Sequence, residues 1–217
     1  MIHIICIKWG DKFSSEYVNK LFKNIQNNTS KEFLFTCFTD NSENINKEIE
    51  IKPIPYFTGD WFSKIGLYNK DLYNSSNQIF YFDLDTIIVG NLDTLLEYKG
   101  DFILLRDFYR PTGFGSGLMS WKPEAVDFMW KNYKNQKLQR GDQAWCEAQY
   151  PTADIWQELY PEKIISYKVH IRDSKKPIRA RYNRKIKRTD HPGTLETASV
   201  ICFHGNPLPH EVPEFWN

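Results

Sequence analysis

The stretch "YFDLDTIIVG", residues 81–90, decides the fold because it places two aspartates, two positions apart, at the end of an apolar run. Burying ionised carboxylates is costly unless a cation or hydrogen-bond donors face them, so Asp83 and Asp85 require a partner. The apolar run predicts a central strand that ends at Asp83. In open α/β sheets ligands bind beyond the carboxyl ends of the strands, and we therefore expect a functional site at this pair.

Upstream of the aspartates, apolar patterns of strand and helix type alternate. We expect strands at "HIICIK", "EFLFTCFTD" and "IEIKPIP", and helices at "SSEYVNKLFKNI" and "DWFSKIGLYNKDLY". Downstream, "NLDTLLEY", "PEAVDFMWKNYK" and "GDQAWCEAQY" predict helices, while "DFILLRD", "GSGLMSWKP" and "SVICFHG" predict strands. This order indicates an α/β fold, and 217 residues fit a single domain over 1–217.

The last third of the chain contains two segments of different character. The stretch "KVHIRDSKKPIRARYNRKIKR" opens a basic loop, predicted over residues 168–190, that has little apolar periodicity. Residues 205–217 contain closely spaced prolines and no helical period. We expect this final segment to run extended over the surface, with Phe215 and Trp216 docked in a groove.

The composition is that of a globular protein without a strong charge bias. Hydrophobic residues make up 41% of the chain, aromatic residues 16%, and the net charge is +1, which gives no general attraction to nucleic acid. The N-terminal "MIHIICIKWG" predicts a buried strand rather than a signal peptide or a membrane span. The four cysteines are far apart without ligand spacing, which favours reduced structural thiols in a cytoplasmic protein.

The aspartate pair has three interpretations. Alternation along an extended segment sends residues 83 and 85 to the same side, where both carboxylates can approach a divalent cation shared with substrate phosphates. A second interpretation is a strand-end turn with capping aspartates. A third is a phosphatase of the haloacid dehalogenase type, whose motif normally continues with Gly-Thr on the first strand, whereas Thr86 follows directly here.

Several segments together resemble glycosyltransferases with the GT-A fold, and within them the glycogenin and bacterial galactosyltransferase family of retaining enzymes. The similar segments are "FDLDTIIVGNLDTLL", "KIGLY", "FGSGLM" and "GDQAW". The resemblance implies a single-domain GT-A (Rossmann-like) fold with a central mixed, mostly parallel sheet flanked by helices. It also implies a nucleotide-diphosphate sugar donor, most often a UDP-sugar, together with Mn²⁺ or Mg²⁺.

The resemblance also assigns candidate site residues. Asp83, Asp85 and His204 would bind the metal, although a capping histidine in the final turn is the alternative for His204. Lys64 would reach the nucleotide. The opening "IKWGDKF" occupies the place of the uridine-binding loop, which would put Lys8, Trp9 and Phe13 near the base and ribose.

Two departures from the family pattern matter. Gly115 stands where the family has asparagine, and Leu208 stands where its C-terminal motif has lysine. We expect the basic loop to replace that lysine at the diphosphate, through a set of cations consisting of Lys175, Lys176, Arg179 and Arg181. A solvated loop and an anionic membrane surface are the alternatives.

Asp142 and Gln143 are the candidate catalytic residues, because a carboxylate and an amide beside the anomeric carbon can orient donor hydroxyls and stabilise a positively charged transition state. Asp142 also fits the start of a helix. Asp107 is a second candidate for holding donor hydroxyls, with a salt bridge to Arg106 or Arg110 as its alternative. For the large aromatic side chains of Trp61 and Trp121 we expect packing roles.

The sequence therefore predicts a metal-dependent glycosyltransferase that transfers a hexose from a UDP-sugar to a glycan, with retention of configuration. The alternatives are the phosphatase and a non-catalytic sugar-nucleotide-binding domain. We expect a cytoplasmic location, with peripheral membrane contact through the basic loop.

Overall fold

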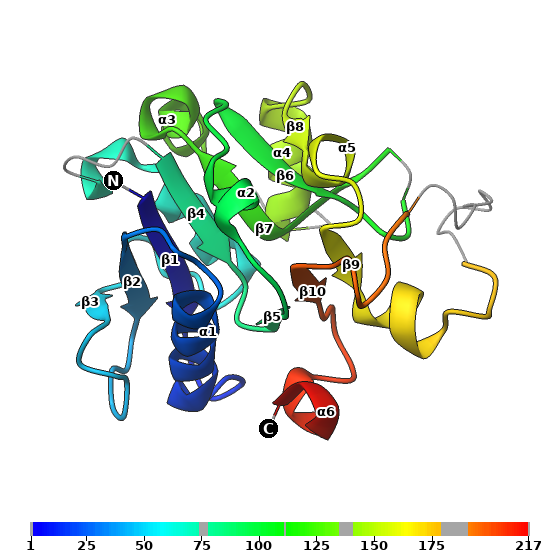
Figure 1. Ribbon diagram of the computed structural model, residues 1–217. Helices are drawn as coiled ribbons and strands as arrows, with labels where there is room; N and C mark the ends of the chain where they lie inside the picture. Colours follow the sequence, from blue (N-terminus) through cyan, green and yellow to red (C-terminus); the bar gives the residue numbers. More distant parts are fainter. Residues whose placement is uncertain (1, 74–77, 111, 135–140, 179–190, 217) are drawn as a thin grey trace.

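The computed structural model describes residues 2–73, 78–110, 112–134, 141–178 and 191–216 (Figure 1). Its centre is a seven-stranded sheet in the order β3-β2-β1-β4-β7-β6-β8. Strand β7 is antiparallel to both neighbours, and the other adjacent pairs are parallel. This confirms the expected mixed, mostly parallel sheet. The strands are β1 (Ile2–Lys8), β2 (Phe33–Thr39), β3 (Glu50–Lys52), β4 (Gln78–Phe82), β6 (Phe102–Arg106), β7 (Phe114–Trp121) and β8 (Asp154–Ile155).

Helices cover both faces of this sheet because each presents an apolar stripe to it. On one face, α1 (Ser15–Asn27) and α2 (Asp93–Leu96) pack into one hydrophobic cluster with Trp156 at the start of α5 (Trp156–Leu159). On the other face, α3 (Pro123–Lys131) and α4 (Gly141–Gln149) pack with the 3₁₀ helix η1 (Trp61–Tyr68) in a second cluster. A further short 3₁₀ turn, η2, spans Lys70–Leu72.

A second, smaller sheet is the main feature that the sequence did not predict. It joins β5 (Thr86–Ile88), β10 (Val200–Cys202) and β9 (Ile164–Ser166), with β10 in the middle. The run at 86–88 directly follows Asp85 and is too short to show a period, so its pairing depends on a partner far along the chain. Because β10 pairs with β5, the residues after β10 are brought back to the aspartate pair.

Two expectations for the aromatic residues have opposite outcomes. Trp121 is fully buried, as predicted. The packing role predicted for Trp61 is wrong, since this residue is 63% exposed at the first position of η1. The prediction of one α-helix over residues 60–73 is also wrong, because the segment forms two 3₁₀ helices, η1 and η2.

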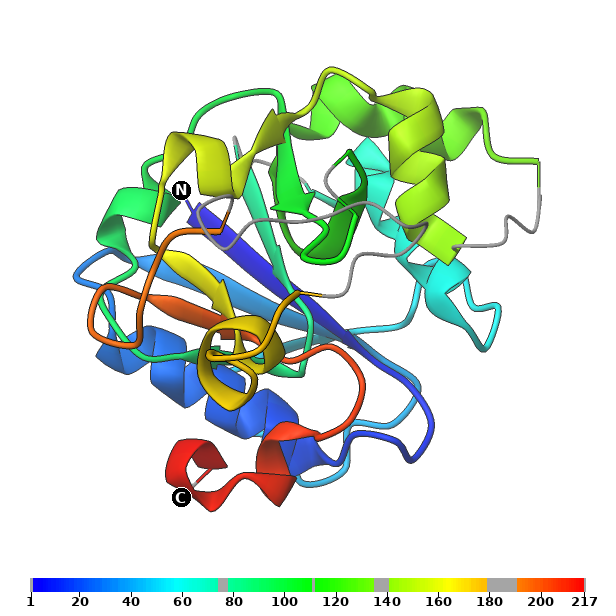
Figure 2. The ribbon, with the colours of Figure 1, turned by 90° about the vertical axis from the view of Figure 1, so that its right-hand side faces the viewer.

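The C-terminal segment packs on the domain through Phe215 and Trp216, as predicted, but its predicted extended conformation is wrong. Residues Pro209–Glu211 (η6) and Pro213–Trp216 (α6) form helical turns, each beginning with a proline, a position at which proline's missing N–H costs nothing. The Trp216 ring lies 4.3 Å from that of Tyr17, so α6 lies beside α1 (Figure 2). The Phe215 ring contacts the Tyr167 ring at 6.0 Å.

The basic stretch begins with a helical turn. Residues Tyr167–Arg172 form a π-helical turn, η3, rather than the loop expected from residue 168. Arg179, Arg181 and the rest of 179–190 lie outside the described residues.

The remaining expectations concern cysteines and membranes. All four cysteines are buried and free, in agreement with structural thiols. Of the helices that the structure describes, none combines the length and the hydropathy needed to cross a bilayer.

Candidate active site

Parallel pairing gathers the candidate residues at one edge of the main sheet. Strands β1, β2 and β4 run in the same direction, so their carboxyl ends meet at the lower edge in Figure 1. Ile5 pairs with Tyr81, and continuing that register by two residues brings Asp83 level with Ile7, next to Lys8. The aspartate pair therefore lies at the carboxyl ends of parallel strands, as the sequence predicts.

The "DLD" turn is fixed by β7 and by its own backbone. The Asp83 N–H donates to the Gly117 carbonyl at 2.8 Å, and the Thr86 N–H donates to the Asp83 carbonyl at 3.1 Å. A Cβ at Gly117 would lie 3.3 Å from Asp83 Oδ2, so glycine leaves room for the carboxylate. Leu84 points into the core with 4% exposure, which leaves Asp83 and Asp85 on the open side.

Lys64 is the counter-ion of this turn. Its ammonium lies 2.8 Å from Asp83 Oδ1 and 3.6 Å from Asp142 Oδ2, and its side chain is 5% exposed. Burial alone lowers the pKa of Lys64, but the carboxylates of Asp83 and Asp142 outweigh it, so the pKa lies above its usual value. The Tyr81 hydroxyl also donates to Asp83 Oδ1. Lys64 thus contacts both Asp83, a candidate metal ligand, and Asp142, a candidate catalytic residue.

Asp142 occupies the first turn of α4, where Gly141 has a φ of +60°, a conformation that favours glycine. The Asp142 side chain is 5% exposed, and burial raises the pKa of its carboxyl against the opposing effects of Lys64 and a hydrogen bond from Ser116. Gln143 follows in the same turn and is partly exposed. Asp142 therefore lies at a helix start, as one interpretation expected, and its catalytic role stays a prediction.

Asp85 lies on the open side of the turn. Burial and the neighbouring Asp83 carboxylate raise the pKa of Asp85 to about 7. Among the described residues, the ion pairs at this edge join the Lys64 ammonium to Asp83 and Asp142 and leave Asp85 without such a contact. The carboxylates of Asp83, Asp85 and Asp142 thus outnumber the one ammonium that contacts them in the part of the chain that the structure describes, and carboxylate oxygens are ligands that a hard divalent cation takes.

His204 lies next to this turn, because the N–H of the preceding residue, Phe203, donates to the Asp85 carbonyl at 3.0 Å. Its Nε2 is 2.6 Å from Ser166 Oγ, and its ring stacks on Phe108 at 5.7 Å. Burial, followed by the nearby Lys168, lowers the pKa of His204 to about 4, so the imidazole is neutral at pH 7.

The full metal-ligand set is not assembled. Within the described part of the chain, no group of three or more His, Cys, Asp or Glu side chains is close enough to hold a metal ion. The assignment of Asp83, Asp85 and His204 as ligands therefore stays a prediction, and His204 would have to exchange its Ser166 partner for the metal.

Lys168 is a further candidate site residue, which the sequence did not single out. Its ammonium donates to the His204 carbonyl, and a Cβ at Gly205 would lie 3.5 Å from Nζ. Burial and Arg172 lower the pKa of Lys168, while Asp85 opposes this. Of the cations expected from the basic loop, Lys176 pairs with Asp173 at 2.8 Å, and Arg179 and Arg181 are not described. The only sequence signal for Lys168 is its place at the start of that loop.

The predicted nucleotide-binding residues lie at the end of β1 and just after it, at the same edge of the sheet. Lys8 is 6% exposed and ends the strand, while Trp9 packs on the cluster beneath η1. Phe13 packs on the opposite side, edge-on to Tyr17 at 4.9 Å. The residues therefore lie at the correct edge, although Trp9 and Phe13 face different clusters.

Asp107 has a structural partner. Its carboxylate accepts hydrogen bonds from the Arg110 guanidinium at 2.6 Å and from the Tyr109 N–H at 2.7 Å. Arg110 continues to Glu147 of α4 at 2.8 Å. The salt bridge to Arg110 was one of the two alternatives stated for Asp107, and a role in holding donor hydroxyls stays a prediction.

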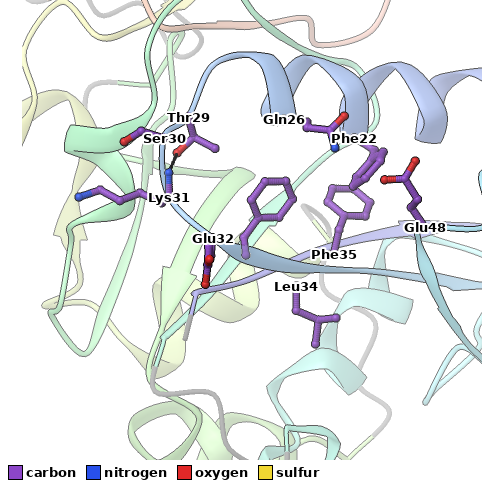
Figure 3. Close-up of a pocket in the computed structure, with 10 residues that line it drawn as sticks. Phe22, Gln26, Thr29, Ser30, Lys31, Glu32, Leu34, Phe35 and Glu48 are labelled. Carbon is purple, nitrogen blue, oxygen red and sulfur yellow. Dashed lines mark hydrogen bonds between the residues drawn. The ribbon is translucent and has the colours of Figure 1, made fainter.

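A pocket elsewhere in the molecule is separate from this edge (Figure 3). Phe22, Phe33 and Phe35 line it, together with the polar residues that follow α1. Because β2 starts at Phe33 and runs parallel to β1 and β4, the pocket lies at the amino end of the sheet, opposite Asp83. It does not contain any of the candidate site residues.

The sequence matches no family model and no curated protein. Solved structures resemble the fold, and three glycosyltransferases are among them. The bifunctional glycosyltransferase WbbM has a TM-score of 0.70 and 10% sequence identity, and the match covers 96% of this chain and 46% of WbbM. The glycosyltransferase GlyE of Streptococcus pneumoniae TIGR4 has a TM-score of 0.64 and 12% identity, over 99% of this chain and 58% of GlyE. The galactosyltransferase LgtC, in complex with donor and acceptor sugar analogues, has a TM-score of 0.59 and 13% identity, over 99% of this chain and 92% of LgtC.

The chain spans about half the length of WbbM and of GlyE, whereas it covers 92% of LgtC. At these identities the likeness shows the fold, and the protein accordingly has a GT-A-like glycosyltransferase fold.

Proposed function

We propose that this protein transfers a hexose from a UDP-sugar to a glycan acceptor, in a metal-dependent reaction that retains the anomeric configuration. The observation that carries the proposal is the Asp83–Lys64–Asp142 cluster beside Asp85, at the carboxyl edge of a GT-A-like sheet. The structure of LgtC with donor and acceptor sugar analogues supports the same substrate classes on this fold.

The metal site would be formed by Asp83 and Asp85, with neutral His204 as third ligand. A bound divalent cation would neutralise the charge that develops on the leaving diphosphate. The Lys64 ammonium and the Tyr81 hydroxyl contact Asp83 and would orient its carboxylate for this role.

The sugar would lie at the start of α4. Asp142 is held by Lys64 and Ser116, so its carboxylate is fixed before substrate binds and can orient donor hydroxyls. Gln143, one residue further and partly exposed, would present its amide to the anomeric carbon. Lys8, Trp9 and Phe13 would contact the base and ribose at the end of β1.

Calorimetric titration of UDP with Mn²⁺, with Mg²⁺ and with chelator tests the proposal. Metal-dependent binding is the expected result, and a panel of UDP-sugars should then release UDP, with the product anomer read by NMR. Binding without turnover of any donor would favour the non-catalytic domain. Hydrolysis of a phosphomonoester without any UDP binding would favour the phosphatase.

Lys168→Ala is expected to raise the Kd of UDP in the presence of Mn²⁺ by about tenfold, because one charge-assisted hydrogen bond to the diphosphate is lost. Lys168 lies beside His204 and Asp85, where the leaving diphosphate would meet the metal. Lys99→Ala is the matched control and should leave the Kd unchanged, since Lys99 is exposed just before β6, at the edge of the sheet opposite Asp83. Equal effects of the two substitutions would contradict this role for Lys168.

A further inference from the structure

Two large aromatic side chains are exposed where the chain enters η1, one in the preceding turn and one at the first position of the helix. Phe57 is 56% exposed and Trp61 is 63% exposed. In Figure 2 this cyan segment projects beside the yellow-green start of α4. Aromatic side chains of this size are usually covered, so their exposure calls for an explanation.

Hydrogen bonds within residues 58–63 form the turn that holds Trp61 at the surface. The Thr58 N–H donates to Ser63 Oγ at 3.1 Å, and Asp60 Oδ1 accepts from the Thr58 hydroxyl at 2.6 Å and from the Phe62 N–H at 3.0 Å. Gly59, with a φ of +71°, supplies the left-handed residue of the turn. The turn therefore presents Trp61 in a defined place instead of leaving it on a frayed end.

Trp61 lies next to the proposed donor-sugar site. A Cβ at Gly141 would lie 3.4 Å from Trp61 Cβ, directly before Asp142. In a 3₁₀ helix the side chains at positions i and i+3 are eclipsed, so Trp61 stands on the same side of η1 as Lys64. Lys64 in turn contacts Asp83 and Asp142. The indole is thus one helical turn from the cluster at which transfer would occur.

We propose that Trp61 is the platform on which a sugar ring of the acceptor stacks. A hexopyranose has one face of C–H groups, which packs on a broad aromatic ring, and an acceptor must lie beside the donor sugar to receive it. The nucleotide base is the less fitting occupant, because its predicted residues lie at the end of β1 and just after it, whereas Trp61 begins η1 and lies against the start of α4. The inference rests on the proposed function and specifies its acceptor site.

Two variants and one control test the platform. Trp61→Ala removes the ring, Trp61→Phe keeps a smaller one, and Leu159→Ala removes another apolar side chain, 51% exposed on α5. Saturation-transfer NMR with Mg²⁺ and UDP would use the methyl glycosides of glucose, galactose and N-acetylglucosamine, together with lactose and maltose. Calorimetry would measure the Kd of UDP for each protein.

We expect at least one saccharide to bind the wild type and the Leu159 variant. Its signal should fall about fivefold or more in Trp61→Ala and recover partly in Trp61→Phe, with the Kd of UDP within about twofold throughout. An unchanged saturation-transfer signal of the saccharide in Trp61→Ala overturns the platform. The same conclusion follows if the wild type binds UDP but gives no signal with any saccharide. If Trp61→Ala lost as much affinity for UDP as for the saccharide, Trp61 would belong to the donor site and the acceptor platform would be overturned. A wild type that binds neither UDP nor any saccharide would overturn the proposed function along with the platform.

Discussion

Asp85→Asn is expected to weaken the metal-dependent binding of UDP by about 100-fold or more, because it removes one carboxylate from the proposed metal site while keeping the size of the side chain. Of the carboxylates of Asp83, Asp85 and Asp142, that of Asp85 is the one that no ion pair among the described residues engages. Calorimetric titration of UDP with Mn²⁺ and with chelator measures the effect. Binding by the variant should be as weak with metal as the wild type is without it.

A matched control is Asp71→Asn, which removes a carboxylate from an exposed position of η2. Its Kd for UDP should equal that of the wild type. If Asp85→Asn also bound UDP and Mn²⁺ normally, the aspartate pair would be a capped strand end, and the metal site would have to be sought elsewhere.

The same substitution should stabilise the metal-free protein at alkaline pH. The pKa of Asp85 is raised from 3.8 to about 7, so the folded state holds this proton more tightly than the unfolded state does. Its contribution to stability is fully present below about pH 4, is lost progressively as the pH rises towards 7, and is absent above that value. We expect Asp85→Asn to gain up to about 4 kcal/mol in free energy of unfolding at pH 8 in chelator, the free energy that corresponds to a pKa raised from 3.8 to about 7, and nothing at pH 4. Urea unfolding at the two values measures this, and an equal effect at both would contradict the cause.

Lys64→Met is expected to cost about 3–5 kcal/mol of unfolding free energy, because it leaves the carboxylates of Asp83 and Asp142 without their cation. Methionine keeps an unbranched apolar chain in the space of the lysine stem, so the loss reports the charge more than the volume. Lys64 is 5% exposed, which leaves little room for water to replace it. Urea unfolding at pH 7.5 measures the cost.

Lys122→Met is the control for Lys64→Met, since Lys122 forms an ion pair with Asp101 at 2.8 Å on the exposed surface. We expect its cost to stay below about 1 kcal/mol. Adding Asp142→Asn to Lys64→Met should recover part of the lost stability, because one of the unpaired charges is removed. A Lys64 variant as stable as the control would show that the cluster does not depend on this ion pair.

The part of the site close to the aspartates could be predicted from the sequence. An apolar run followed by "DLD" puts Asp83 at a strand end whatever the rest of the chain does. The apolar period of α1 and the proline at the start of α3 are equally local, and both helices are where the pattern predicts them.

The contacts between distant segments could not be predicted in this way. The approach of Lys64 to Asp142 joins η1 to α4, and no pattern in either segment reports the other. Lys168 reaches His204 through the pairing of β9 with β10, two strands of three residues each. Short strands have too few residues for a period, so their pairing is decided by what else is available to cover them.

The amino-acid sequence by itself determined the α/β class, the strand that carries Asp83 and the edge at which chemistry is expected, because hydrophobic periodicity and strand direction act over neighbouring residues. The tertiary structure alone decided which charges face one another and which aromatic rings stay in water. Lys64 is a counter-ion and Trp61 an exposed ring because η1 is a tight 3₁₀ helix that lies against the start of α4. Such contacts depend on packing between elements that are distant in the chain, and packing carries no local signature.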